Sequence, residues 1–174
     1  MRRFFLPFLT TILFVFESIF VDLVQPHGIF SGDKIFVPHF VVILIIFITV
    51  YGDKMVGMLY GIIFGLLVDL VYTEIIGVYM FSFPLVAYIV AKVMNVLQSN
   101  LFILSSISII FIVIMEFFVY GVNLLINLTE IELELFFYKR LIPTVLLNGV
   151  FIFLFSYPLR RFVTKVITHN REEL

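Results

Sequence analysis

Long apolar runs occupy most of this chain and decide the solvent in which it can fold. Of its 174 residues, 63% are hydrophobic and 13% are charged, and the mean hydropathy is +1.20. A water-soluble domain is ordinarily about 45–50% apolar and about 25% charged. A soluble domain of this length could not bury so much apolar surface. We therefore expect one integral membrane domain over residues 1–174, with lipid around most of the chain.

Breakers and polar turns divide the apolar runs into six predicted helical spans, because one bilayer crossing takes about 20 residues. The second run is short, since about 16 helical residues rise only about 24 Å against a hydrocarbon core of about 30 Å. It predicts either a thin-membrane crossing or half of a re-entrant hairpin. Pro38 suits the first turn of that helix, and Pro84 predicts a kink in the fourth. The predicted spans are about Phe4–Leu23, Phe36–Tyr51, Met55–Tyr72, Ile75–Val93, Leu101–Ile126 and Leu141–Phe162.

The segment TEIELELFFYKR, residues 129–140, is the one long polar stretch late in the chain. Its alternation of apolar and polar residues fits a short strand. Thr129 followed by Glu132 also forms a capping box, with Lys139 and Arg140 at the other end. We expect a short interfacial helix that leads into the last span.

The distribution of Lys and Arg predicts the orientation of the bundle. The N-terminus is basic and then apolar, but no small-residue cleavage site follows, so we interpret it as an uncleaved first span. With six crossings and a cytoplasmic N-terminus, eight basic residues face the cytoplasm and three face outward. This excess predicts that both termini are cytoplasmic. The outer three are Lys34, Lys139 and Arg140, and the inner eight are Arg2, Arg3, Lys54, Lys92, Arg160, Arg161, Lys165 and Arg171.

Small residues recur at four-residue spacing on two of the predicted spans. Gly57, Gly61 and Gly65 form a stripe on the third span, and Ala87 and Ala91 repeat the spacing on the fourth. Such stripes let two helix backbones approach closely in a membrane. They predict either packing within the bundle or a seam for the transmembrane helix of a partner protein.

Several polar side chains fall inside the predicted spans, where they are costly in lipid. Asp69 lies about one turn from the outer end of the third span and is expected near the interface, whereas Glu17 and Glu116 lie deeper. A polar stripe continues from Glu116 through Tyr120 and Asn123 and should face the bundle interior, and Asn148 pairs with Thr144 on the last span.

No Lys or Arg is expected deep enough to neutralise Glu17 or Glu116. Each is therefore expected to be protonated, or held by amide and hydroxyl groups. The polar groups are either structural links between helices or a site for a proton or a ligand.

The remaining composition excludes several classes of function. There is no cysteine, and His27, His39 and His169 share no metal-ligand spacing. The net charge of −1 gives no electrostatic case for nucleic acid. No nucleotide-binding or hydrolase motif is present, and the loops are too short to build a reactive centre in water. We expect no enzyme activity, no cofactor and no metal.

The stretch from Pro38 to Val93 resembles the rod shape-determining protein family MreD of bacteria. The features that carry the resemblance are Pro38–His39 before a short span, the run Gly-xxx-Gly-Leu-xx-Asp over residues 61–69, Gly77, and Pro84 followed by Lys92. The length, the six-span layout and the basic ends are similar as well, so the likeness covers nearly the whole chain.

The resemblance implies a non-enzymatic scaffold of the cell-elongation machinery in the cytoplasmic membrane, which supports cell shape and side-wall peptidoglycan synthesis. Its implied partners are MreC, and also RodA, the transpeptidase partner of RodA and MreB filaments. The implied fold is a compact all-α bundle, similar to the substrate-binding subunits of energy-coupling-factor transporters.

The alternative function is therefore a vitamin-type substrate-binding subunit of a transporter, with Glu116 and Asn123 at the ligand. The first span lacks the alanine-spaced face that such subunits usually carry, which disfavours this alternative.

Overall fold

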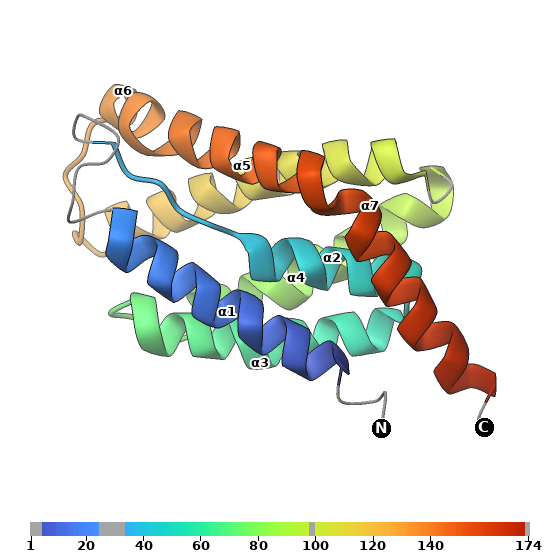
Figure 1. Cartoon of the computed structure of the whole chain (residues 1–174). Helices are drawn as coiled ribbons and strands as arrows, with labels where there is room; N and C mark the ends of the chain where they lie inside the picture. Colours follow the sequence, from blue (N-terminus) through green and yellow to red (C-terminus); the bar gives the residue numbers. More distant parts are fainter. Residues whose placement is uncertain (1–4, 25–33, 98–99, 173–174) are drawn as a thin grey trace.

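The computed structural model describes residues 5–24, 34–97 and 100–172, and all regular structure in these ranges is helical (Figure 1). The chain forms one bundle in which helices of different lengths run side by side. The elements are α1 (Phe5–Val24), α2 (Phe40–Tyr51), α3 (Lys54–Tyr72), α4 (Val78–Leu97), α5 (Leu101–Leu125), α6 (Leu133–Phe136), the π-helical turn η2 (Phe137–Leu141) and α7 (Ile142–Glu172).

Within the described ranges, five segments are long and apolar enough to cross a membrane, and the short apolar helix α2 adds a sixth apolar element. The prediction of an all-α membrane bundle is thus confirmed. Most helices begin and end within about four residues of the predicted positions, whereas α7 continues to Glu172, beyond the predicted end at Phe162. The start of α1 and the end of α7 lie at the same end of the bundle (Figure 1). This arrangement is the one that six crossings produce.

The second crossing is half extended and half helical. Residues 34–39 have no regular structure, and α2 follows them for 12 residues. Six extended residues cover about 20 Å and 12 helical residues about 18 Å, so together they are long enough to span a bilayer core of about 30 Å. Contacts with the last helical segment mark both ends of the crossing: the Ile35 amide donates to the Lys139 carbonyl, and the Arg160 guanidinium lies over the Tyr51 ring.

Two expectations about this crossing are therefore settled. It traverses the bundle instead of turning back as a re-entrant hairpin. The prediction that Pro38 lies in the first helical turn is wrong, because α2 begins at Phe40 with His39 as its N-cap residue. Pro38 lies in the extended part, where its fixed φ and missing amide hydrogen are tolerated.

The helix α2 forms the centre of the bundle. Every residue from Phe40 to Thr49 is buried. A helix that is apolar on all sides is stable when other helices surround it completely. In the preceding extended segment, Pro38 and His39 are buried, and residues 35–37 are half-buried and line a cavity. Non-helical backbone is tolerated at membrane depth where protein covers it or where it lines a cavity.

The glycine stripe packs α3 against other helices of the same chain. A Cβ atom added at Gly61 would lie 2.8 Å from the backbone nitrogen of Pro84 in α4, and one at Gly65 would lie 2.8 Å from the Cα atom of Met80. At Gly57 the added atom would collide with the Thr49 side chain of α2.

Ala87 and Ala91, the two alanines of the other stripe, are also buried within the bundle. The two stripes therefore pack within the bundle, which is one of the two arrangements that their spacing predicts. The faces that carry the small residues are occupied by this chain, which leaves no room there for a partner's helix.

The late polar segment joins the last crossing without a break. The helix starts at Leu133, with Glu132 as its N-cap residue, and passes through η2 into α7. The expectation of a helix in this segment is confirmed for Leu133 onward. Thr129 does not begin that helix, and its hydroxyl accepts a hydrogen bond from the Ile131 amide instead. The strand alternative is wrong, since residues 129–132 pair with no other strand in the described chain.

Candidate functional site: a polar interior around the second crossing

The extended segment 34–39 has alternate amide groups that point toward the last helical segment. The amides of Ile35, Val37 and His39 donate to the Lys139 carbonyl, the Thr144 hydroxyl and the Asn148 side chain, over 2.7, 3.2 and 2.8 Å. Two extended residues advance about 6.6 Å and four helical residues about 6 Å. The two repeats nearly match, so one face of a helix can satisfy an extended strand in place of a neighbouring strand.

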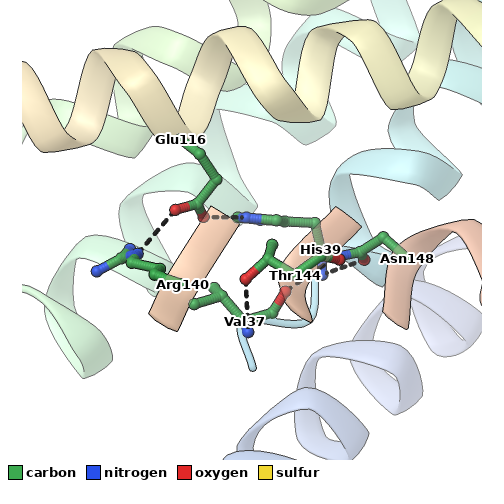
Figure 2. A network of polar contacts seen from close by, with 6 residues as sticks. All are labelled: Val37, His39, Glu116, Arg140, Thr144 and Asn148. Atoms are coloured by element: carbon green, nitrogen blue, oxygen red, sulfur yellow. Dashed lines mark hydrogen bonds and ion pairs between the residues drawn. The ribbon is translucent and has the colours of Figure 1, made fainter. Parts of the chain in front are cut away.

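Asn148 is the central residue of this contact (Figure 2). Its side-chain oxygen accepts from the His39 amide, and its nitrogen donates to the carbonyls of Val37 and Thr144 over 2.9 and 2.8 Å. The side chain is fully buried. A carboxamide supplies both the donor and the acceptor that an extended backbone needs, which an apolar or a charged side chain does not. The predicted polar pair of Thr144 and Asn148 therefore holds the second crossing.

Glu116 of α5 joins two elements that are far apart in the sequence. Its carboxylate accepts from His39 Nε2 and from Arg140 Nε, each over 2.7 Å (Figure 2). Glu116 is 1% exposed, and its side chain is fully covered. The prediction that no cation reaches this carboxylate is wrong. Arg140 is expected from the sequence as an outward-facing charge at the end of an interfacial helix, whereas the structure places its guanidinium against the buried Glu116.

Glu17 of α1 caps the buried start of α2. Its Oε1 atom accepts from the Val41 amide over 2.8 Å. The first amides of a helix have no partner within the helix, and a carboxylate there also complements the helix dipole. Glu17 lies within α1, away from both helix ends, and is buried against the start of α2. Its partner is a backbone amide, so amide and hydroxyl side chains are not what holds it.

Asp69 has the same role at the start of α4. Its two carboxylate oxygens accept from the amides of Gly77, Tyr79 and Met80, each over 2.9 Å. Asp69 lies about one turn from the end of α3, as expected, and it is 0% exposed because the protein covers it. Gly77 has φ +120°, a conformation that residues with a side chain rarely adopt.

The run of residues 61–69 thus works as one unit. Its glycines bring α4 against α3, and its aspartate caps the helix that they bring.

The polar stripe on α5 divides beyond Glu116. The Tyr120 hydroxyl donates to the Ile131 carbonyl over 2.7 Å, and its ring stacks on Phe136. Asn123 lines a cavity of about 440 Å³, which lies among α1, α3, α4, α5 and the extended segment. Glu17, His39 and Arg140 line the same cavity. The stripe therefore faces protein and this cavity up to Asn123, while Asn127 beyond the end of α5 is exposed.

His39 and Arg140 are the members of this site that sequence reasoning missed. The sequence shows no metal-ligand spacing for His39, which also contributes to the family resemblance, and it predicts Arg140 as an outward-facing charge at the end of a short helix. A usable signal existed for Arg140, because the helical pattern of residues 133–141 is continuous with the last span. No spacing within the sequence connects His39 with Glu116, which lies 77 residues later.

Two comparisons with known proteins indicate the same family. The family model of rod shape-determining protein MreD matches residues 2–166. The rod shape-determining protein MreD of Bacillus subtilis (strain 168) is 35% identical over 173 residues, which cover 99% of this chain and 100% of that protein. No solved structure matches the chain, so the likeness to transporter subunits stays an expectation. The chain belongs to the MreD family of rod shape-determining proteins, and its role is in the determination of cell shape.

Proposed function

We propose that this protein is a non-enzymatic membrane scaffold of the cell-elongation machinery. It would bind the transmembrane helix of MreC and lie beside RodA, the transpeptidase partner of RodA and MreB filaments. In this way it would support cell shape and side-wall peptidoglycan synthesis. Membership in the MreD family supports the role in cell shape, and the named partners are the finer part of the proposal.

The observation that carries the proposal is the use of the buried polar groups. Glu17, Asp69 and Glu116 each accept hydrogen bonds that hold crossings together. The outer surface of the bundle carries many large, exposed apolar side chains. A bundle of this kind acts through contacts with other membrane proteins, because it carries little mass outside the membrane.

The docking face would lie on outward surfaces and not on the small-residue stripes. Each long helix presents large apolar side chains outward, among them Phe8 of α1, Phe81 of α4 and Phe153 of α7. Helices associate in lipid through close packing and weak interhelical bonds.

The chain lacks cysteine, which allows a direct mapping experiment. Single cysteines at Phe8, Leu59, Phe81, Ile110 and Phe153 would be combined with a cysteine in the transmembrane helix of MreC and oxidised in membranes. We expect disulfides from one contiguous outward face and none from the buried control Ala87→Cys. Equal cross-linking from every face, or none from any, would contradict the proposal.

The absence of cysteine also allows a test of the proposed orientation, in which both termini of the chain are cytoplasmic. A membrane-impermeant maleimide applied to intact spheroplasts should label Glu130→Cys, in the connection before α6. It should leave Asp53→Cys, in the turn between α2 and α3, unlabelled until the membrane is opened. The opposite pattern would reverse the orientation.

A further inference from the structure

The cavity at the α3–α4 connection has the size and lining of a small-molecule site. Its volume of about 440 Å³ falls within the range of about 300–1,000 Å³ that is typical of ligand pockets. Apolar side chains from three helices form its walls, including Val68, Phe83 and Val119. The scaffold proposal makes no use of this space.

One part of the lining offers donors for an oxyanion. Arg140 donates its Nε hydrogen to Glu116 and also bonds the Tyr79 side chain, and its terminal nitrogens point away from the Glu116 carboxylate (Figure 2). These two bonds leave further N–H donors of the guanidinium for a ligand. An arginine has five N–H donors in a planar fork that fits carboxylate and phosphate groups. The side chain of Arg140 is 27% exposed and lines the cavity together with the Asn123 amide. The pairing with Glu116 fixes the guanidinium in place before any ligand arrives.

Another part of the lining is acidic. Glu17 lies on the cavity wall, and Glu74 lies in the exposed connection between α3 and α4. A purely anionic ligand would meet these carboxyl groups, and a purely cationic ligand would meet Arg140. A molecule that carries both charges can place each of them beside its complement.

We propose that this cavity binds a zwitterionic small molecule, with an oxyanion group at Arg140, an ammonium group toward Glu74 and Glu17, and an apolar part against Phe83 and its neighbours. Two sources share this chemistry. One is the head group of a zwitterionic phospholipid, and the other is a free amino acid with an apolar side chain. The inference is independent of the scaffold proposal, because it needs no partner protein.

Three probes test the chemistry on the full chain purified in a neutral maltoside detergent. They are dihexanoyl phosphatidylethanolamine, leucine, and dihexanoyl phosphatidylglycerol, which has the phosphate without the amine. Calorimetry should show binding of the first or the second probe, at least about fivefold tighter than the third, as an added ion pair allows. Binding of the lipid alone assigns the lipid source, and binding of leucine alone assigns the free source. Equal binding of the two lipids, or no binding of any probe, would overturn the proposal.

Two pairs of variants locate the binding. Val78 lines the cavity, so Val78→Trp should fill it and weaken binding at least about tenfold, whereas Val71→Trp on the exposed face of α3 should not. Glu74→Gln should weaken binding of the zwitterion about three- to fivefold, and Glu130→Gln outside the cavity should not. Thermal unfolding confirms that each variant is folded. Unchanged binding by both cavity variants would refute this location.

Discussion

Separating the Glu116–Arg140 pair should reveal how strongly it holds the last crossing to α5. The two groups are joined over 2.7 Å, the Glu116 side chain is fully covered, and the Arg140 side chain is 27% exposed. Two unit charges about 4 Å apart interact by about 4 kcal/mol at an effective dielectric constant of about 20. Removing one partner of a buried pair costs about 3–5 kcal/mol, because the other charge is left alone. Water reaches Arg140 in part, so we expect a loss of about 2–4 kcal/mol for Glu116→Gln or Arg140→Gln.

The double variant separates the pair from the other bonds of each residue. Glu116→Gln with Arg140→Gln should cost about 2 kcal/mol less than the two single changes together. The free energy of unfolding would be measured by titration with dodecyl sulfate in maltoside micelles, followed by the helical circular dichroism. The matched control combines Glu116→Gln with Arg160→Gln, which lies at the other end of the bundle over Tyr51. A coupling below about 0.5 kcal/mol for the pair, no larger than that of the control, would refute the reasoning.

Three further predictions concern the packing and capping of single helices, each measured by the same titration. Gly61→Ala should cost about 1–3 kcal/mol, because its Cβ meets the Pro84 backbone, while Gly149→Ala meets nothing and should be neutral or stabilising by up to about 1 kcal/mol. Equal effects of the two would contradict the close approach of α3 and α4. Asp69→Ala should cost about 2–4 kcal/mol, since three amides lose their acceptor, and a loss below about 1 kcal/mol would argue against the cap. Asn148→Leu should cost about 2–4 kcal/mol because the buried His39 amide and the half-buried Val37 carbonyl lose their partner, and an unchanged stability would contradict that contact.

The sequence predicts the helices of this bundle well, because each helix is defined by a local apolar run. The spacing of Gly61 and Gly65 predicts a close approach of helices, and the depth of Glu116 predicts burial. What spacing cannot supply is the identity of the neighbour across the contact. Gly61 was compatible with a partner protein or with α4, and only the fold assigns it to α4.

The errors have the same physical origin. The position of Asp69 near the end of its own helix does not reveal that its carboxylate caps the start of α4. The extended segment before α2 is largely apolar, and its proline is tolerated both in an extended chain and in the first turn of a helix. Its backbone is stabilised by Thr144 and Asn148, more than 100 residues later. Local patterns therefore indicated a helix where distant side chains stabilise an extended chain.

Hydrogen exchange across residues 35–41 tests the half-extended second crossing most directly. In the protein purified in detergent, mass spectrometry should find these amides nearly as protected as those of α2, because Ile35, Val37, His39 and Val41 each donate to a partner. The variant Asn148→Ala should raise exchange in this segment while α3 stays protected. Rapid exchange of residues 35–41 in the unaltered protein would contradict the account.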